Sequence, residues 1–495
     1  MTKTTRPNVF LVCADHLRND ALGCNGNPFV HTPNIDRLAA SGVTFRNSFS
    51  PNPICVPARA SVTTGNYPHR ATGVTANSGR IRDDQPKLAE HFNNAGYGTY
   101  AIGKLHYVPY AKPGEPRLVH GYQSVDLMEE GRITSTYAPD PPPGLEDYFD
   151  YLADVGWAGY TRAHGTGNND VHPAPSPLPA EHYVDQWVAR TTIRRLEEHN
   201  GKRAGTPWLA WMSFPKPHPP YDPPEPYHRF YDPRRIPRPV GSLDDLVHKA
   251  SHLRNVRSHY NWSLMSPEAI QVARAHYFGL VTFQDYCFGQ ILDYLDATDQ
   301  RENTIIVYLA DHGDLLGDFG CFFKTNMLDG SVRVPSVWSG PGIELRYEPH
   351  DALVGSHDIF PTIAQMIGAP LDQPVHGKDL SAVLSGASDG VRDVIVSETG
   401  GDGDRQLMAC DGRWKFIYSE INGFEEFYDA ESDPFEESNI APDTPDQTAR
   451  LRRKLIDWCH ETDFVSMLDG NDLQKVEHDV APEDFKGGSF GWRWY

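Results

Sequence analysis

Cysteine is scarce in this chain and irregularly spaced. Seven cysteines occur among 495 residues, an odd number with no repeating interval. Small secreted proteins that depend on a disulfide framework carry cysteines in even numbers and at high density, so that class is excluded. The scatter fits a reducing compartment, and we expect the protein to be cytoplasmic.

Long apolar runs are also missing. No stretch approaches the roughly 18 continuous apolar residues of a membrane span. The opening residues "MTKTTRPNVFLVCADH" lack the apolar segment and small-residue cleavage site of a secretory signal. We therefore expect a soluble protein with no membrane partner.

Positive charge is in deficit. The chain has 45 lysines and arginines against 66 aspartates and glutamates, a formal net charge of −21. Nucleic acids, heparin-like polyanions and anionic membranes would be repelled, so none of them is expected as the main partner. A small anionic substrate held in a locally basic pocket is compatible with this balance.

The length exceeds what one hydrophobic core usually organises, so we expect one large domain and one smaller domain. Up to about residue 370, short apolar runs that end on polar residues alternate with helical stretches. This alternation is typical of an α/β domain with a mostly parallel sheet. The predicted strands lie within 8–16, 96–106, 206–224 and 303–314, and the predicted helices within 32–42, 184–199 and 268–297.

The pattern changes near residue 370. The segments "VIVSE", "QLMAC", "WKFIYS" and "EEFYD" are short strands at close spacing, and a helix follows over 444–463. We expect a small α+β domain over 371–495, an antiparallel sheet with one helix, beside a catalytic domain over 1–370. Residues 107–183 are rich in proline, glycine, tyrosine and histidine, and we expect long loops there that cover the site.

The tripeptide Ala-Asp-His occurs twice, at 14–16 and 310–312, each time at the end of an apolar strand. Ligands of open α/β sheets bind beyond the carboxyl ends of the strands, so both copies are expected at one rim. Carboxylates with one or two imidazoles suit Ca²⁺, Mg²⁺ or Mn²⁺ better than a thiolate-bound metal. The alternative is that each aspartate caps a loop or a helix, but the duplication favours a metal site.

The stretch "NPICVPARASVTTG" holds a cysteine with no second cysteine within reach for a CxxC pair. Cys55 is predicted to lie at the start of a helix, where free backbone N–H groups favour an anion. A phosphatase that uses a thiolate would place its arginine six residues after the cysteine, but Arg59 follows after four. A buried structural cysteine is the common alternative. Pro57 and Arg59 argue against it.

Cys-x-Pro-x-Arg, present as "CVPAR" at 55–59, resembles the signature of the sulfatase family, in which the cysteine is oxidised after synthesis to formylglycine. The resemblance covers roughly the first 370 residues. It implies an alkaline-phosphatase-like α/β fold, one divalent metal ion, a formylglycine-generating enzyme as maturation partner and hydrolysis of sulfate esters. The stretches that share the family's order are "TGNYPHR" (64–70), "GYGTYAIGKLH" (96–106), "PHPPYDPP" (217–224), "ADHGD" (310–314) and "KTNMLDGSVRVP" (324–335).

The chemistry explains the need for an oxidised cysteine. A hydrated aldehyde carries two hydroxyls on one carbon. One hydroxyl, made more acidic by the metal, attacks the sulfur. The second then loses its proton, and the aldehyde forms again as sulfate leaves. A serine could attack but could not release its ester in this way, so Cys55 is interpreted as a precursor.

The resemblance also implies roles for individual residues. Asp15, Asp311 and His312 would bind the metal together with modified Cys55. His16 stands where many members of the family carry Asp, Gln or Asn, and it could still be a ligand. Calcium is the expected ion, and Mn²⁺ or Mg²⁺ are the alternatives. The preference for calcium over manganese is narrow, because imidazole ligands make a softer site than oxygen alone.

Five further side chains would act on the substrate. Arg59 would brace the nucleophile. Lys104 and His106 would contact the sulfate and help to deprotonate the second hydroxyl. His218 and Lys324 would bind a sulfate oxygen and the leaving-group oxygen, with His218 as the general acid.

Several other residues admit two interpretations. Asn77 could contact the substrate or support a residue that does, and we include it among the substrate-binding residues. His69 and Arg333 are expected to be structural. Trp157, Tyr160 and Trp211 could line the pocket or pack elsewhere in the molecule.

The function expected from these residues is hydrolysis of a small sulfate monoester, aryl or alkyl, to an alcohol and sulfate. The main alternative is a phosphonate monoester or phosphodiester hydrolase of the same superfamily. Val56 argues for a sulfatase, because glycine usually follows the cysteine in that branch. A catalytically silent binding protein is a third interpretation, and the complete set of site residues argues against it.

The last residues, "DFKGGSFGWRWY" (484–495), place four aromatic side chains behind a glycine hinge at 487 and 488. Aromatic anchors are typical of buried interfaces, and choline-sulfatase-like members resemble this chain in having such an extension. We expect a homo-oligomer, a dimer or tetramer, in which Trp492 and Trp494 dock on a neighbouring subunit. The alternative is that the tail folds back on its own small domain.

Overall fold

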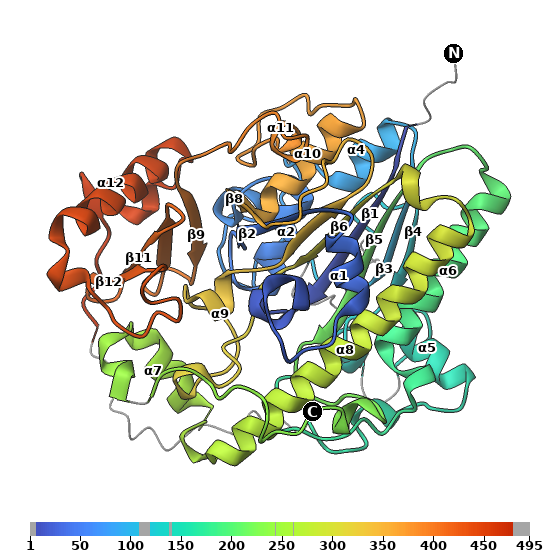
Figure 1. Ribbon diagram of the computed structural model, residues 1–495, viewed down its shortest axis with the longest axis horizontal. Helices are drawn as coiled ribbons and strands as arrows, with labels where there is room; N and C mark the ends of the chain where they lie inside the picture. The colour runs from blue at the N-terminus through green and yellow to red at the C-terminus, as the bar shows by residue number, and fades with distance from the viewer. Residues whose placement is uncertain (1–5, 108–118, 138–140, 243, 261, 479–495) are drawn as a thin grey trace.

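The computed structural model describes residues 6–107, 119–137, 141–242, 244–260 and 262–478. A large central sheet with helices on both faces adjoins a smaller sheet at one side (Figure 1). The prediction of a mostly parallel sheet flanked by helices, with a smaller antiparallel sheet after it, is confirmed. The domain boundary at residue 370 stays a prediction.

The large sheet has eight strands in the order β4-β3-β5-β1-β6-β7-β2-β8. Only β7 runs antiparallel to its neighbours, and every other pairing is parallel. The strands are β1 (Asn8–Asp15), β2 (Gly42–Phe49), β3 (Gly98–Gly103), β4 (Ser124–Leu127), β5 (Trp208–Pro217), β6 (Thr304–Ala310), β7 (Ser336–Ser339) and β8 (His350–Gly355).

The central strands are buried on both faces, which explains their unbroken apolar sequences. In β1, Phe10 and Val12 pack into one core, and Leu11 and Cys13 pack into the core on the opposite face. The first core includes α1 (Pro33–Ala39), α6 (Val184–Lys202) and α8 (Pro267–Ala297). The second includes α2 (Cys55–Thr64), α4 (Leu88–Asn94) and α10 (Ile359–Met366).

The small sheet is antiparallel, with strand order β12-β11-β10-β9. Residues of α12 pack on it in a separate apolar cluster. Lys415 of β11 reaches back to the large domain and pairs with Asp329 of α9 at 2.6 Å. The elements are β9 (Ile395–Thr399), β10 (Gln406–Cys410), β11 (Trp414–Ser419), β12 (Phe424–Asp429), α9 (Asp329–Val332) and α12 (Pro445–Glu461), with a short hairpin of β13 (Leu468–Asp469) and β14 (Asp472–Leu473).

The expectation that 107–183 forms only loops is wrong. In the described part of this stretch, β4 pairs in parallel with β3 and adds an edge to the sheet, and α5 (Asp147–Asp154) follows. β4 has only four residues, too few to give a pattern. The remaining helices are α3 (Pro68–Ala71), α7 (Ser251–His259) and α11 (Ser381–Leu384). In the part of the chain described, no helix is both long and apolar enough to cross a membrane.

Candidate active site

The site lies beyond the carboxyl ends of the parallel strands, as is usual for open α/β sheets. β1 and β6 are neighbours in register, with Ala14 opposite Ala310, so the two Ala-Asp-His copies lie side by side. Lys104 follows β3 and His218 follows β5. The topology thus brings together residues that are up to 300 positions apart in the sequence.

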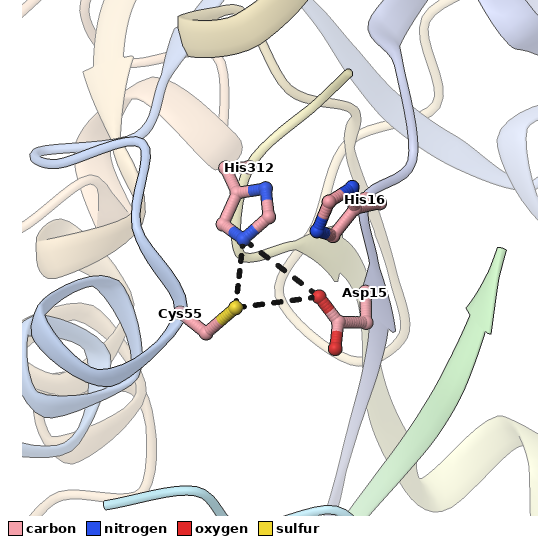
Figure 2. Close-up of side chains that lie close together, drawn as sticks. All are labelled: Asp15, His16, Cys55 and His312. Atoms are coloured by element: carbon pink, nitrogen blue, oxygen red, sulfur yellow. Dashed lines mark hydrogen bonds and ion pairs between the residues drawn. The ribbon is translucent and has the colours of Figure 1, made fainter. Parts of the chain in front are cut away.

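Cys55 is the first residue of α2 and is buried. Its Sγ lies 3.1 Å from Nε2 of His312 and 3.8 Å from Oδ1 of Asp15 (Figure 2). Oδ1 of Asn77 accepts a hydrogen bond from the backbone N–H of Val56 at 3.1 Å. The Asn77 side chain therefore faces the start of the helix that presents the cysteine.

His312 directs one ring nitrogen at this cluster. Its Nδ1 lies 2.9 Å from the carbonyl oxygen of Gly313, which can only accept, so Nδ1 carries the proton. Nε2 lies 3.7 Å from Oδ1 of both Asp15 and Asp311. Burial opposes a charge on this ring, but Asp311 and Cys55 raise its pKa. Such an orientation, fixed by a backbone carbonyl, is typical of a metal-binding histidine.

His16 lies on the other side of the cluster. Its Nδ1 contacts Oδ2 of Asp314 at 2.8 Å, and its Nε2 accepts from Lys324. The ligand atoms of Asp15, His16, Cys55 and His312 all lie within 4.8 Å of one another. These side chains are the four drawn in Figure 2.

Arg59 lies one helical turn after Cys55 and is fully buried. Its Nε donates to Oδ2 of Asp311 at 2.8 Å, and its Nη1 donates to the backbone oxygen of Lys104 and to Oγ of Ser213. Nη2 has no hydrogen-bond partner among the described residues. Arg59 thus ties together β3, β5 and β6, and its Nη2 lies 3.8 Å from Oδ2 of Asp15.

Lys104 and His106 form the turn after β3. Lys104 donates to Oδ2 of Asp15 and, at 3.0 Å, to Oε2 of Glu130. The backbone N–H of His106 donates to Oε1 of Glu129 at 2.7 Å, which holds the residue at a φ of 45°. Nδ1 of His106 is buried and lacks a partner in the described parts of the chain.

His218 comes from the proline-rich loop after β5. Nδ1 lies 2.6 Å from the carbonyl oxygen of Pro219 and therefore carries a proton. Oε1 of Glu130 lies 3.5 Å from the same nitrogen. Lys216 pins this loop, because its Nζ donates to two backbone carbonyls of the loop and to Asp222 at 2.7 Å.

Burial and local charge set the protonation states. Burial lowers the pKa of three histidines well below the usual value. A nearby positive charge lowers each pKa further: Lys324 acts on His16, Arg132 on His106 and Lys104 on His218. These three rings are therefore neutral in the free protein and can ligate a cation or accept a proton.

A family model described as Sulfatase matches residues 7–369. The chain belongs to the sulfatase family. An arylsulfatase of Clostridium perfringens is 28% identical in an alignment of 489 positions that covers 95% of this chain and 98% of the relative. A choline-sulfatase of Rhizobium meliloti is 28% identical over 447 residues, which are 88% of this chain and 83% of that protein.

The crystal structure of a phosphonate monoester hydrolase of Agrobacterium radiobacter shares the fold, with a TM-score of 0.77 and 24% identity over 92% of this chain and 96% of the other. Its low identity makes this a similarity of fold alone. This sulfatase is therefore a sulfuric ester hydrolase by family and has the alkaline-phosphatase-like architecture that the sequence predicted.

Sulfatases generally use a metal ion and formylglycine, and the residues present fit both. Carboxylate oxygens and an imidazole nitrogen converge beside Cys55, and such donors suit a divalent cation. In a second group of potential ligands, Asp15, Glu130 and His218, both carboxylates pair with the ammonium of Lys104, so a positive charge is already present there.

The sequence did not single out Glu129, Glu130, Arg132 or Asp314. Glu129, Glu130 and Asp314 contact predicted site residues, and Arg132 pairs with Glu130. The acidic pair "EE", one residue beyond the end of a strand, was the available signal, but β4 is too short to be recognised from its pattern.

The structure shows what surrounds the other residues that the sequence singled out. His69 contacts Glu398 of the small sheet, and Arg333 pairs with Asp329, so both have structural partners. Trp211 is fully buried in the core of the large sheet. Trp157 packs edge-on against Tyr160, whose side chain is exposed. Trp492 and Trp494 lie outside the described residues.

Proposed function

We propose that this sulfatase hydrolyses a small organic sulfate monoester, aryl or alkyl, with formylglycine made from Cys55 as its nucleophile. The observation that carries this proposal is the close approach of Cys55 Sγ to Nε2 of His312 and Oδ1 of Asp15. A formylglycine-generating enzyme is the maturation partner that this chemistry requires.

In this proposal Asp15, His16, Asp311 and His312 hold one divalent ion, with modified Cys55 as a further ligand. Calcium is the preferred ion, and Mn²⁺ or Mg²⁺ are the alternatives. When bound, the ion would supply positive charge that acidifies a hydroxyl of the nucleophile and stabilises sulfate oxygens.

Arg59 and two lysines supply fixed positive charge. Nη2 of Arg59 makes no hydrogen bond among the described residues, only an ion pair with Asp15 at 3.8 Å, and it can therefore donate to the nucleophile. The bonds of this guanidinium to Asp311 and Ser213 hold it in place. Lys104 contacts Asp15 and Lys324 contacts His16, so both ammonium groups are close enough to the cluster to bind sulfate oxygens. Charge placed in advance, in a buried site, stabilises the transition state without reorganisation.

Two neutral histidines move protons. His106 can accept the proton of the second hydroxyl, because its Nδ1 is unpartnered among the described residues and its ring is neutral. His218 keeps Nδ1–H on Pro219, so Nε2 is the nitrogen that can protonate the leaving alcohol. The negative charge of a bound ester favours the protonated form of this ring.

Replacement of Cys55 tests the nucleophile. In protein produced with the formylglycine-generating enzyme, peptide mass spectrometry should show that the Cys55 thiol has become an aldehyde. Cys55→Ala and Cys55→Ser should nearly abolish turnover of an aryl sulfate, while Cys24→Ala, which changes a cysteine outside the site, should not. Full activity in Cys55→Ala would refute the mechanism.

Elemental analysis tests the metal. The purified enzyme should contain one divalent ion per chain, and Asp311→Asn should lose it. Zinc held by thiolates, or an active preparation without metal, would contradict this part of the proposal.

A further inference from the structure

The loop that carries Lys324 has an unusual backbone. Phe323 and Thr325, on either side of the lysine, have φ values of 66° and 73°. These values lie in the left-handed region, which glycine adopts readily and a β-branched residue such as threonine adopts rarely. A side chain other than glycine stays in this region when the contacts around it determine its conformation. The contacts of Thr325 therefore bear on the position of the neighbouring Lys324.

Thr325 is bonded to two other parts of the chain. Its backbone N–H donates to the carbonyl oxygen of Pro53 at 3.1 Å, two residues before Cys55. Its Oγ1 lies 3.1 Å from Nε2 of His252 on α7, and the same oxygen contacts the backbone oxygen of Lys324. Thr325 thus joins the loop of the proposed nucleophile, the loop of Lys324 and a helix outside the site described above.

His252 connects this loop to the small sheet. Its Nδ1 lies 3.2 Å from Oδ2 of Asp404, in the loop between β9 and β10. A carboxylate can only accept, so Nδ1 carries a proton and Nε2 faces the hydroxyl of Thr325. The side chain of His252 is only 13% exposed, so little water competes for the two nitrogens. We call Asp404, His252 and Thr325 the histidine bridge.

The far end of the histidine bridge is itself fixed. Two backbone N–H groups of the Asp404 loop donate to Oε2 of Glu420. The carbonyl oxygen of Gly400 in this loop accepts from Oγ1 of Thr75, whose backbone oxygen accepts from the amide of Asn52 at 2.7 Å. Asn52 lies three residues before Cys55. One loop of the small sheet therefore supports the nucleophile loop directly and the Lys324 loop through His252.

The helix that carries His252 is also anchored on the small sheet. α7 lies beside this sheet (Figure 1), and the backbone N–H of Ala250, just before the helix, donates to Oε1 of Glu426 on β12 at 3.1 Å. The imidazole is therefore presented from a fixed element, and its contact with Thr325 restricts the loop on the active-site side.

We propose that His252 is a positioning residue for Lys324, and that through it the small sheet holds this lysine in place for the ester. The Lys324 ammonium contacts His16 and lies 5.9 Å from the centre of the Phe323 ring. Without the histidine bridge the loop would relax toward ordinary φ values, and the ammonium would move. A misplacement of about 1 Å can lower a rate about 100-fold. The inference rests on the proposed function for the role of Lys324.

Kinetics of the matured full-length enzyme with 4-nitrophenyl sulfate test the histidine bridge. His252→Ala should lower kcat/KM about 100-fold, and Thr325→Val, which removes the hydroxyl, should do the same. His252→Gln should lose less, because its amide nitrogen can occupy the place of Nε2 and keep the contact with Thr325. His248→Ala is the matched control, since this histidine precedes the same helix and its side chain is exposed.

A second lysine variant separates positioning from a general loss of structure. If His252 acts through Lys324, His252→Ala should reduce kcat/KM no further in an enzyme that already carries Lys324→Ala. An equal reduction in both backgrounds would overturn the inference, as would an unchanged kcat/KM in the single variant His252→Ala.

Hydrogen exchange measured by mass spectrometry gives a readout that does not depend on turnover. In His252→Ala, peptides that contain Thr325 should exchange faster than in the wild-type protein, while peptides of β1 should keep their protection. Unchanged exchange at Thr325, or equal loss of protection in β1, would contradict a positioning role. A matured wild-type enzyme that turns over no sulfate ester would instead refute the proposed function and leave the exchange data to judge the histidine bridge.

Discussion

Glu130 links Lys104, which would bind the sulfate, to His218, which would act on the leaving group. Its Oε2 accepts from Lys104 at 3.0 Å and its Oε1 lies 3.5 Å from Nδ1 of His218. Burial opposes the charge on this carboxyl, but Lys104 and Arg132 outweigh it and lower its pKa, so it is ionised. An ionised carboxylate beside Nδ1 favours the protonated imidazole, which is the state a general acid needs. We interpret Glu130 as a positioning residue.

Glu130→Gln should slow esters with poor leaving groups more than esters with good ones. We expect kcat to fall about 100-fold for an alkyl sulfate, which depends on protonation of the leaving oxygen, and less for 4-nitrophenyl sulfate. Glu129→Gln is the control, since that carboxylate contacts the backbone N–H groups of Leu105 and His106 instead. Its effect should be alike for both esters. If Glu130→Gln also slows both esters equally, Glu130 has only a structural role.

At the scale of elements, residues at the ends of the parallel strands form the site. The sequence revealed β1, β3, β5 and β6, because strands buried on both faces are continuous apolar runs that stop at polar residues. The register of β1 with β6 then placed the two Ala-Asp-His copies together, as predicted. β2, β7 and β8 escaped prediction, as did β4. β2 mixes polar and apolar residues, and β7 has four residues, too few for a pattern.

The short helix α3 joins the two sheets through one ion pair. Nδ1 of His69 lies 2.7 Å from Oε2 of Glu398 on β9, and its Nε2 lies 2.9 Å from the backbone oxygen of Thr462. Burial disfavours the charged ring, but the attraction of Glu398 prevails and the pKa of His69 is raised. A raised pKa in the folded state means that this pair stabilises the fold fully below the unfolded pKa, near 6.5. The contribution is lost as pH rises through the folded pKa.

Glu398→Gln should therefore destabilise the protein most at pH 6 and less in alkaline solution. The expected loss at pH 6 is about 2 kcal/mol, the usual value for a buried hydrogen bond to a charged group. Melting temperatures of both proteins between pH 6 and 9 measure it. His69→Gln should abolish the pH dependence of the difference. A difference that stays constant over this range would show that His69 is not charged in the folded protein.

At the scale of the whole molecule, the small sheet contacts one side of the large domain. Lys415 of β11 lies between Asp329 of α9 and Glu436, at 2.6 and 2.5 Å. Composition and length predicted two units, but not this buried charge cluster, because its members lie far apart in the sequence. The prediction that Trp492 and Trp494 dock on another subunit concerns residues outside those the structure describes.

Deletion of residues 486–495 tests that prediction. Removal of the aromatic anchors should lower the mass measured by light scattering and raise KM, because the tail would reach a neighbouring active site. Replacement of the tail by a glycine-serine segment of equal length controls for chain length. A truncated protein with unchanged mass and kinetics would show that the tail is not an interface.

The most direct test of the account is a turnover panel with enzyme whose formylglycine content at position 55 has been measured. The panel compares a sulfate monoester, a phosphonate monoester and a phosphate diester that share the leaving group 4-nitrophenol. A sulfatase should show the highest kcat/KM for the sulfate, and that rate should rise in proportion to the formylglycine content. A higher kcat/KM for the phosphonate or the diester, or sulfate turnover independent of formylglycine, would contradict the account.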